Sequence, residues 1–469
     1  MSIRLHNTKT RSVEPFEPIE DGKVGLYTCG PTVWNYAHIG NLRTYVFEDV
    51  LRRTLEYHGY DIKHVMNVTD VGHLTGDGDD GEDKMIKGAR ETGQTVWEIA
   101  QHYTDSFFND TDQLNILRPH VICKATDHIE DMIGLIQKLD ERGFVYESAG
   151  NLFFDTTKFE RYGEFARLDR QSLKLGARIA VDEEKKNPAD FALWFTRSKY
   201  EHHIMVWDSP WGKGYPGWHI ECSAMSMKYL GDRFDIHCGG VDHIPVHHTN
   251  EIAQSEGATG KAWVNYWLHG EFLLTEKKKM AKSDGNFLTL AGIIDMDYEP
   301  LDYRYFCLGA HYRTQLQFSA DAMNSARAAR KGIVDRIIRL REKADPSPHE
   351  TVTGKAEVYL SRFKEVLSTD LNAPKGLAEL WSLIKDETVS DDDKLTVAFE
   401  MDKIFGLGLY SSTTVPRSLD DPLLRLISLR EEARERRDYS RADDLREELK
   451  KRGIIVEDTP EGTRWQREK

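Results

Sequence analysis

The stretch that most constrains the fold is residues 24–68, which alternates between strand-like and helix-like patterns. Val24–Cys29 is strand-like and stops at Gly30-Pro31, and Leu42–His58 follows with helix-like spacing. Ile62–Val68 is strand-like again, so the segment predicts one β–α–β unit of a parallel sheet. Because α/β folds place ligand contacts at the carboxyl ends of such strands, we expect a binding site where these two strands end.

The turn between the first strand and the helix has the features of a phosphate site. The helix follows His38-Ile-Gly-Asn41, and the unpaired N–H groups and dipole of a helix amino end attract phosphate. His38 adds a side-chain donor, and Gly40 lets a ligand approach the backbone closely. Far downstream, the basic loop Lys279-Met-Ala-Lys-Ser283 can hold further phosphates of a nucleotide. Each pattern alone is weak evidence for a nucleotide site. A basic cluster, for example, is more often part of the solvent-exposed surface than part of a binding site.

Cysteine, histidine and glutamate residues offer a candidate metal site. Cys29 ends the first strand, Cys222 lies in a helix-like segment, and His247 and Glu251 are spaced to share one helix face. Two thiolates, an imidazole and a carboxylate complete a zinc shell. The spacing leaves two other interpretations open: the cysteines can be small core residues, and other histidines can compete as ligands. These competing histidines are His237, His243 and His248.

Length, charge and cysteine use bound the class of protein. The chain has 469 residues, too many for one core, so several domains are expected. No apolar run approaches the ~20 residues that cross a membrane, and the amino terminus lacks an apolar signal core. The five scattered cysteines make no disulfide framework, so we expect a soluble, cytoplasmic protein. A net charge of −15 argues against a general nucleic-acid binder, although residues 421–469 hold equal numbers of basic and acidic side chains.

The motifs occur together in this order and in fitting local settings, and this combination is specific enough to indicate a family. The chain resembles the cysteinyl-tRNA synthetases, a family of class I aminoacyl-tRNA synthetases, essentially from end to end. His38–Asn41 is similar to the family's HIGH signature, and Lys279–Ser283 is similar to its KMSKS signature. Two residues depart from these signatures. Asn41 replaces a histidine and cannot carry charge, and Ala281 replaces a serine while both lysines remain.

The resemblance implies a ligase that activates L-cysteine with ATP and Mg²⁺ to cysteinyl-adenylate and transfers it to the 3′ end of tRNA(Cys). It implies one zinc ion per chain, which selects cysteine through its thiolate, with Cys29, Cys222, His247 and Glu251 as ligands. We expect a monomer with no membrane partner. The residues implied for catalysis are His38, Asn41, Lys279 and Lys282, and those implied for ATP binding are His38, Gly40 and Lys282.

The remaining implied contacts concern cysteine and tRNA. The cysteine and adenylate pocket is expected at Gly30, Thr69, Trp218, His237 and Asp242. In the carboxyl-terminal domain, Arg437 is expected to reach phosphates or bases. Trp465, which lies between two arginines, suits stacking on an unpaired base; the alternative is that it anchors the packing of this domain.

The resemblance also sets the expected domains, an α/β fold with a Rossmann-type parallel sheet followed by helices. Residues 95–142 are expected to be largely helical. The expected boundaries are 1–119 for the first half of the Rossmann catalytic domain, 120–202 for a connective insertion, 203–266 for the second Rossmann half, 267–325 for the junction with the lysine loop, 326–410 for a helical bundle and 411–469 for an anticodon-binding domain.

Two other functions compete with this interpretation. A related ligase activates cysteine through zinc but joins it to an amino sugar, and residues 411–469 count against it because such an enzyme would not need them. The second is a non-catalytic RNA- or metal-binding module on a decayed synthetase, and the intact His38, Lys279 and Lys282 count against it. The Asp/Gly-rich segment 76–83 has no functional interpretation; it fails as a calcium loop because Glu82 stands where glycine is required.

Overall fold

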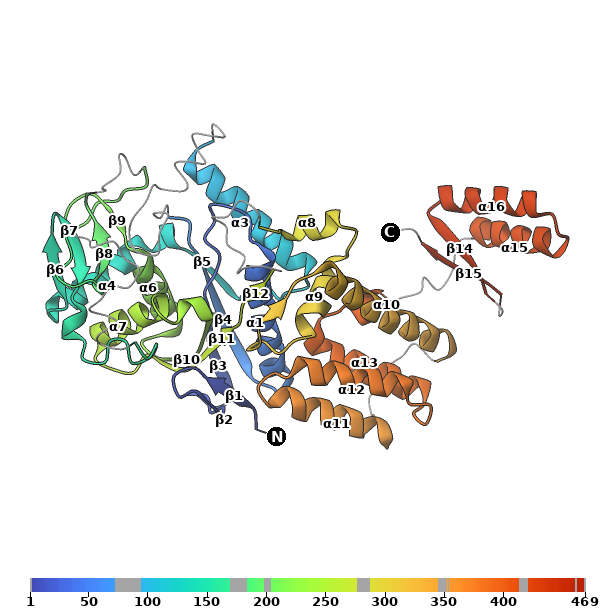
Figure 1. The fold of residues 1–469 in the computed structure, drawn as a ribbon, viewed down its shortest axis with the longest axis horizontal. Helices are drawn as coiled ribbons and strands as arrows, with labels where there is room; N and C mark the ends of the chain where they lie inside the picture. Colours follow the sequence, from blue (N-terminus) through green and yellow to red (C-terminus); the bar gives the residue numbers. More distant parts are fainter. Residues whose placement is uncertain are drawn as a thin grey trace.

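A five-stranded sheet lies at the centre of the molecule (Figure 1). Every neighbouring pair of its strands is parallel. The strand order is β11 (Val264–Gly270), β10 (Phe234–Gly240), β3 (Lys23–Thr28), β4 (Asp61–Val68) and β5 (Val121–Lys124). This computed structural model describes residues 2–71, 94–168, 184–197, 204–275, 287–344, 352, 354–412, 421–459 and 462–467.

Helices cover both faces of the sheet, and the alternation of side chains along the strands explains why. Leu26 and Met66 belong to the hydrophobic core shared with α1, whereas the adjacent Tyr27 and Val65 belong to the core on the other face. Because successive strand residues point to opposite faces, strands buried on both sides read as nearly continuous apolar runs. The first face carries α1 (Ile39–Tyr57) and α3 (Val96–Gln113); the second carries α4 (Ile129–Glu141), α6 (Trp218–Leu230) and α7 (His247–Thr259).

The predicted β–α–β unit is confirmed, with strand and helix bounds close to those expected. The prediction that residues 95–142 are largely helical is confirmed by α3 and α4, but it did not include β5, which pairs with β4 inside the central sheet. This strand has only four residues, too few to show a strand period. It also lies inside the segment expected as an insertion from residue 120, so part of that segment belongs to the central sheet.

A smaller antiparallel sheet projects beside the central one (Figure 1). Its inner strands are short and apolar, as expected for the region after residue 143. Its strands are β6 (Val145–Ser148), β7 (Asn151–Phe154), β8 (Phe191–Phe195) and β9 (Tyr215–Pro216). The chain begins with a hairpin of β1 (Arg4–Asn7) and β2 (Ser12–Pro15), and short 3₁₀ turns lie at η1 (Ala125–His128), η2 (Thr156–Lys158) and η3 (Val241–His243).

Helices dominate after the central sheet. β12 (Leu273–Leu274) pairs with β13 (Leu316–Gln317), and α8 (Leu290–Asp295) and α9 (Pro300–Leu308) lie between them in sequence. The helical bundle then follows with α10 (Ala320–Lys343), α11 (Lys355–Ser368), α12 (Ala373–Lys385), α13 (Asp391–Phe405) and α14 (Leu409–Ser412). No helix within the described ranges is long and apolar enough to cross a membrane.

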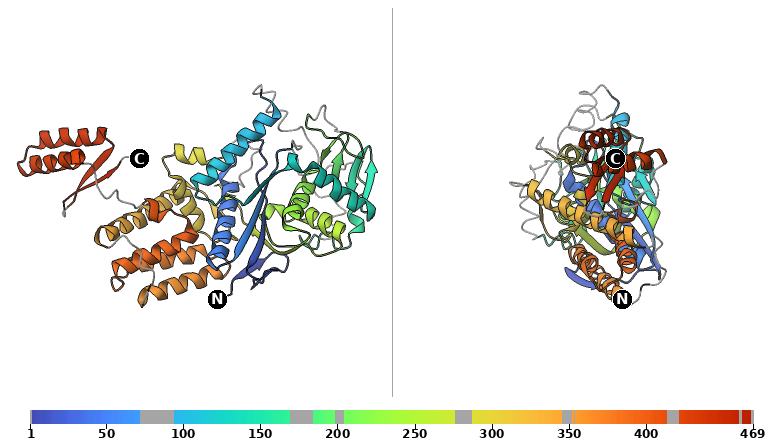
Figure 2. Two further views of the ribbon diagram at one scale, coloured as in Figure 1. Left: turned by 180° about the vertical axis from the view of Figure 1, so that it is seen from behind. Right: turned by 90° about the vertical axis from the view of Figure 1, so that its right-hand side faces the viewer.

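The carboxyl-terminal unit has its own small core. It contains α15 (Asp421–Glu435), α16 (Tyr439–Lys451) and an antiparallel hairpin of β14 (Ile454–Thr459) and β15 (Gly462–Arg467). Leu423, Ile427 and Leu449 form a hydrophobic cluster with residues of β14, separate from the other cores. The left view in Figure 2 draws the unit apart from the bundle. A separate core predicts that the unit can be removed without exposing the main one.

The buried His64 of β4 makes the fold sensitive to acid. Burial, with Arg52 and His120 nearby, lowers the pKa of His64 from 6.5 to about 3. Nε2 of the ring lies 2.9 Å from the Thr28 hydroxyl. The neutral ring therefore stabilises the fold fully above pH 6.5, and this contribution is lost as the pH falls toward the folded-state pKa.

His64→Gln is expected to remove this pH dependence, because an amide stays neutral. The free energy of unfolding of the wild type minus that of the variant should fall below about pH 6.5 by up to about 1.4 kcal/mol per pH unit. Urea unfolding at pH 7, 6, 5 and 4 measures the difference. A difference that stays constant over this range contradicts the buried, neutral state of His64.

Candidate active site and metal centre

The site lies where the order of strands reverses direction. From β3 the chain moves outward to β4 and β5, and it later returns to place β10 on the other side of β3, with β11 beyond it (Figure 1). Open α/β sheets bind ligands at the carboxyl edge of such a switch point. Cys29 and Gly30 follow β3 at this edge, and Asp242 follows β10. The expectation of a site at the ends of these strands agrees with this topology.

The amino end of α1 carries the predicted phosphate motif and is closed by a capping box. His38 is the N-cap residue, and its Nδ1 accepts a hydrogen bond from the backbone N–H of Asn41 at 3.0 Å. In return, the side-chain oxygen of Asn41 accepts from the backbone N–H of His38 at 3.3 Å. Since Nδ1 accepts, the neutral His38 ring carries its proton on Nε2. The asparagine that departs from the family signature thus has a structural task at this cap.

Two glycines shape this edge for steric reasons. At Gly40, an added Cβ would lie 2.9 Å from Nδ1 of His38, so any other residue would displace the ring from its capping position. At Gly30, an added Cβ would lie 1.6 Å from the backbone oxygen of Asn67, which leaves no room for a side chain. The Gly30 N–H also donates to the Asn67 side chain at 2.8 Å. Gly40 was expected to let a ligand approach the backbone closely. The structure shows a second reason for glycine here, because a side chain would collide with the His38 ring.

Gly40→Ala is expected to lower the rate of nucleotide activation by roughly 100-fold, because a displacement near 1 Å in a catalytic group has effects of that size. Nucleotide-dependent pyrophosphate exchange measures the rate. The matched control is Gly134→Ala in α4, where an added Cβ meets nothing within 4 Å. That control should keep full activity and gain stability, since alanine favours a helix interior over glycine. Equal activity in the two variants would show that the His38 ring position is unimportant.

The predicted metal ligands come together. Cys29, Cys222, His247 and Glu251 are all buried, and their donor atoms lie within 4.8 Å of one another. They come from the end of β3, from α6 and from the first turns of α7. Cys29, His237 and His248 form an overlapping group whose donor atoms also lie within 4.8 Å of one another, and Sγ of Cys29 lies 3.3 Å from Nε2 of His248. The competing ligands considered from the sequence are therefore close by.

The carboxylate in this group suits a cation. Within the described part of the chain, neither side-chain oxygen of Glu251 has a hydrogen-bond partner, although both are buried. Ring nitrogens of His237 and His247 lie 3.2 and 3.3 Å from them. Burial and the neighbouring histidines lower the pKa of His248 far below its usual value, so that ring is neutral. A buried carboxylate without donors is costly unless a cation or proton pairs with it.

The thiols are protonated when no cation is present. Burial raises the pKa of Cys29 well above its usual value, and the contact with Cys222 raises it further. The contact with Cys29 lowers the pKa of Cys222, but burial and the nearby carboxylates of Glu251 and Glu221 together leave that pKa raised. A metal cation reverses this order, because a coordinating thiol is deprotonated outright. The two thiols are thus neutral without a cation and become thiolates when they coordinate a metal ion.

The residues expected to bind cysteine line the same edge. The Thr69 hydroxyl donates to Glu221 at 2.9 Å and accepts from the Asn67 side chain at 3.1 Å. The half-buried Trp218 ring lies 5.2 Å from that of His247. The other expected residues differ in exposure: His237 is fully buried and stacks on Trp267, whereas Asp242 is exposed. The predicted pocket omitted Asn67, whose side chain joins Gly30 to Thr69; its place near the carboxyl end of the strand-like run was the signal that could have found it.

Several predicted residues lie outside the described residues. These are Lys279, Ala281 and Lys282 of the lysine loop and the segment 76–83. The side chain of Trp465 also lies outside, although β15 places its backbone opposite Val456. Thr289, just beyond the lysine loop, forms a bridge with His38, and the Ile39 N–H donates to the Leu288 carbonyl at 2.8 Å. Leu288 and Thr289, which follow the lysine loop in sequence, therefore lie against the amino end of α1.

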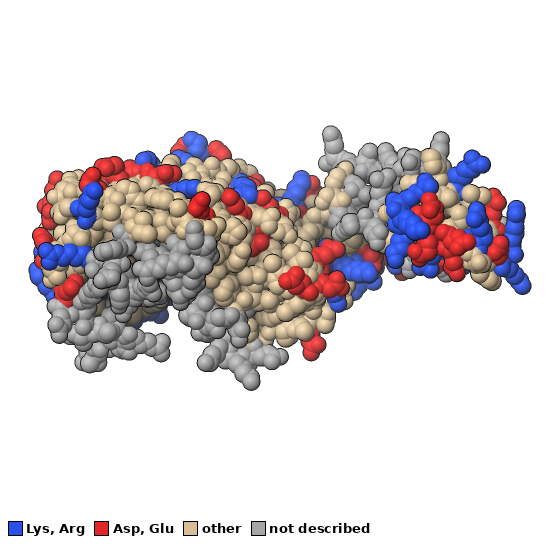
Figure 3. Space-filling model, turned by 90° about the horizontal axis from the view of Figure 1, so that it is seen from above, with Lys and Arg blue, Asp and Glu red and all other residues tan. Residues whose placement is uncertain are grey.

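The carboxyl-terminal unit carries charges of both signs (Figure 3). Arg430 and Arg434 bind the carboxylate of Asp458, so these two arginines serve the unit's own structure. Arg437 is exposed and has a positive φ of 59°, in the turn before α16. Arg437, the arginine expected to contact RNA, is thus exposed to solvent, whereas Arg434 is bound by Asp458.

Comparisons with known proteins match the whole chain. A family model described as the class I (C) tRNA synthetase catalytic domain matches residues 15–328, and one described as the cysteinyl-tRNA ligase anticodon binding domain matches residues 417–465. A cysteine–tRNA ligase of Treponema denticola is 50% identical over 495 aligned residues that cover all of both chains. The chain belongs to the class I cysteinyl-tRNA synthetase family.

Other members of the cysteinyl-tRNA synthetase family match over similar lengths. A cysteine–tRNA ligase of Burkholderia lata is 48% identical over 99% of this chain and 97% of its own. A solved methionyl-tRNA synthetase of Mycobacterium tuberculosis, bound to methionyl-adenylate, is 15% identical, has a TM-score of 0.56, and covers 86% of this chain and 94% of its own. A LeuRS of Agrobacterium radiobacter, in a ternary complex, has a TM-score of 0.57 at 11% identity with 86% coverage of both chains. These structural likenesses show a shared fold, which confirms the expected α/β architecture.

Proposed function

We propose that this chain activates L-cysteine with ATP and transfers it to the 3′ end of tRNA(Cys). The observation that carries the proposal is a buried group of two thiols, an imidazole and a carboxylate at the end of β3, the strand from which the chain continues to α1. A helix amino end that binds phosphate is common to many nucleotide-binding proteins. Only the neighbouring sulfur-rich group makes the site suited to a substrate that itself carries a thiol.

Cys29, Cys222, His247 and Glu251 would hold one zinc ion. The donor set fits, because zinc favours Cys, His and carboxylate ligands, and because Glu251 has no hydrogen-bond donor among the described residues. Bound zinc would supply a soft Lewis acid that prefers a thiolate to a hydroxyl, and so would distinguish cysteine from serine. The role of the protein is to keep these four side chains dry and close together.

Adenylation needs no protein nucleophile. The cysteine carboxylate attacks the α-phosphorus of ATP, which enters with Mg²⁺, and pyrophosphate leaves with the bond electrons. Catalysis then depends on positioning and on stabilising charge. Nε2 of His38 and the backbone N–H of Gly40 would face the phosphates, while Lys279 and Lys282 would neutralise the leaving pyrophosphate. Asn41 would act by holding the His38 backbone.

The remaining side chains orient the substrates. Gly30, Thr69, Trp218, His237 and Asp242 would surround cysteine and its adenylate. In the second step, a terminal ribose hydroxyl of tRNA attacks the adenylate carbonyl, and AMP leaves. The carboxyl-terminal unit would bind the anticodon arm, with Arg437 and Trp465 as contact residues. The match of residues 417–465 to an anticodon binding domain supports tRNA as the acceptor and gives no support to an amino-sugar acceptor.

Cysteine-dependent ATP–pyrophosphate exchange by the zinc-loaded protein tests the first step. We expect exchange with cysteine and at least ~10⁴-fold lower kcat/KM with serine, as for sites that recognise one polar group of the substrate. Lack of any cysteine-dependent exchange would favour a non-catalytic RNA- or metal-binding protein. Equal exchange with serine would refute selection through sulfur.

A further inference from the structure

Three aromatic rings form a cluster beside the amino end of α1. Tyr36 lies two residues before His38, and it is 40% exposed. The centroid of its ring lies 5.9 Å from that of His102 and 5.0 Å from that of Tyr103, both on α3, at interplanar angles of 77° and 89°. The His102 and Tyr103 rings lie 5.1 Å apart at 71°. Each ring therefore meets the other two edge to face, a favourable geometry for aromatic pairs.

This aromatic cluster of Tyr36, His102 and Tyr103 is anchored at one side and open to solvent at the other. Tyr103 is half-buried and packs against the hydrophobic core shared with α1. His102 is exposed, and its Nε2 lies 3.2 Å from the Tyr36 hydroxyl. Single exposed apolar side chains are common, but grouped ones mark interaction surfaces. The two exposed rings are thus held in place by each other and by Tyr103.

The aromatic cluster is tied to the carboxyl edge of the sheet, where the candidate site lies. In the segment that leads to Tyr36, the Val33 N–H donates to the Thr69 carbonyl, just after β4, at 3.2 Å. On α3, the side-chain oxygen of Gln101 accepts from Nζ of Lys124, the last residue of β5, at 2.9 Å. Printed contacts therefore join both segments of the cluster to strand ends at this edge.

The charge beside the aromatic cluster is nearly balanced. Nζ of Lys124 is positive, and the amide N–H₂ of Gln101 donates to the carboxylate of Asp105 at 2.7 Å. A strong positive field would bind any stretch of nucleic acid through its phosphates. Here the rings dominate the local chemistry. Exposed rings bind unpaired bases by stacking, whatever the base, because every base has a π-face.

The reaction brings one unpaired stretch of RNA to this edge. By the proposed function, the terminal ribose of tRNA reaches the adenylate beside the amino end of α1, so the unpaired nucleotides before it lie on the adjacent surface. Two residues separate Tyr36 from His38, a distance of at most about 7 Å along the backbone. Unpaired RNA ends are commonly recognised by stacking on aromatic side chains. The aromatic cluster is therefore continuous with the site that the RNA end must enter.

We propose that Tyr36 and His102 form a stacking platform for the unpaired bases that precede the terminal ribose of tRNA. This inference rests on the proposed function. The platform positions the 3′ end for transfer and does not select one tRNA over another. Adenylation does not use it, because tRNA is absent from that step. An acceptor-stem minihelix uses it as fully as a full-length tRNA does, since both carry the same unpaired end.

Tyr36→Ala tests the proposal in charging reactions. We expect kcat/KM for full-length tRNA and for the minihelix each to fall about 10-fold, as the loss of one base–aromatic stack predicts, while cysteine-dependent exchange changes less than ~2-fold. Tyr36→Phe keeps the ring and loses only the hydroxyl next to His102, so it should restore charging. His102→Ala should lower charging of both RNAs and likewise spare exchange.

Binding of shortened tRNA distinguishes stacking from a purely structural role. The wild type should bind intact tRNA about 10-fold more tightly than tRNA without its unpaired 3′ nucleotides, and Tyr36→Ala should bind both equally. Tyr410→Ala is the matched control. Tyr410 is a 51% exposed tyrosine of α14, and its ring meets that of Phe399 edge to face at 5.2 Å. This control should keep the wild-type preference for intact tRNA.

Three results would overturn the inference. The first is a Tyr36→Ala protein that keeps the full preference for intact tRNA. The second is a raised KM for ATP with normal tRNA charging at saturating ATP, which would assign the ring to the adenine of ATP. The third is an equal loss of exchange and charging, which would mean that Tyr36 only supports the catalytic site. If Tyr36→Ala does not fold, the exposed His102→Ala decides. A wild type that charges no tRNA refutes the proposed function instead.

Discussion

Cys222→Ser is expected to lose its bound zinc and to raise the KM for cysteine by roughly 100-fold or more, since even residues behind the ligands affect metal sites 10- to 100-fold. A serine hydroxyl is a poor zinc ligand compared with a thiolate. Cys222 is 2% exposed, so the change also leaves a buried hydroxyl among Cys29, His247 and Glu251. Metal analysis after dialysis and the KM for cysteine in pyrophosphate exchange measure the two effects.

Cys307→Ser is the matched control for this variant. Cys307 is also buried, but it packs in the core around α9 and α1, away from the metal donors. Its variant should keep normal zinc content and a normal KM for cysteine, even if its stability falls. A Cys222→Ser protein with full metal content and an unchanged KM would exclude Cys222 from the ligand set.

Removal of residues 413–469 is expected to abolish most tRNA charging and to spare adenylation. Specific RNA and DNA contacts raise affinity by ~10³-fold or more over non-specific contacts, so kcat/KM for tRNA should fall on that scale. The truncation keeps α14, which ends at Ser412, and the lost unit has a separate hydrophobic cluster. Charging with labelled cysteine and pyrophosphate exchange measure the two steps on one preparation.

For this prediction to hold, the truncation must impair tRNA charging and leave adenylation intact. Exchange in the truncated protein should stay within about 2-fold of the wild type, because domains with their own cores fold independently. Equal losses in exchange and charging would mean that the carboxyl-terminal unit is needed for the fold of the catalytic domain. A truncated protein that charges full-length tRNA normally would exclude this unit from tRNA recognition.

Local patterns predicted the parts of the fold that are long and periodic. The β–α–β unit around α1 was predicted with nearly the right bounds, because the apolar runs of its strands and the spacing in its helix are distinct signals. β5 was missed because four residues carry no period. β15, which contains Trp465, was also not predicted, since a strand with a single apolar side chain among its six residues leaves little hydrophobic signal.

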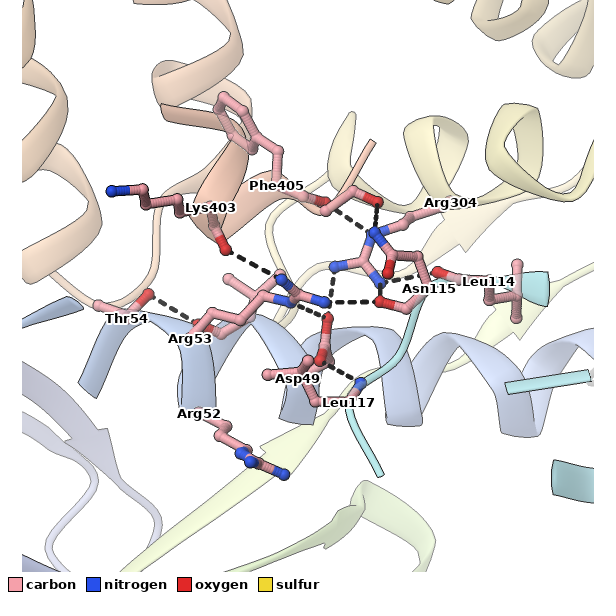
Figure 4. A network of polar contacts seen from close by, with 12 residues as sticks. Asp49, Arg52, Arg53, Thr54, Leu114, Asn115, Leu117, Arg304, Lys403 and Phe405 are labelled. Carbon is pink, nitrogen blue, oxygen red and sulfur yellow. Dashed lines mark hydrogen bonds and ion pairs between the residues drawn. The ribbon is translucent and has the colours of Figure 1, made fainter. Parts of the chain in front are cut away.

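Residue types and spacing predicted a candidate metal site, but only the family resemblance selected one ligand set for it. The spacing of Cys29, Cys222 and His247 allowed several ligand sets, because contacts between distant segments depend on the packing of β3, α6 and α7. The capping contact of Asn41 was likewise not predicted, because a histidine–asparagine pair is unlike the usual Ser/Thr and Glu signature of a capping box. Arg304 donates to the carboxylate of Asp49, which lies 255 positions earlier in the sequence (Figure 4). No local sequence pattern can predict a contact over such a separation.

The most direct test of the account is charging of deacylated tRNA(Cys) with labelled cysteine by the zinc-loaded, full-length protein. We predict stable cysteinyl-tRNA that requires ATP, zinc and cysteine, with no product when serine replaces cysteine. The same protein should not transfer cysteine to an amino sugar. Transfer to an amino sugar without transfer to tRNA, or equal charging with serine, would contradict the assignment of this site as a sulfur-selective activator that serves tRNA.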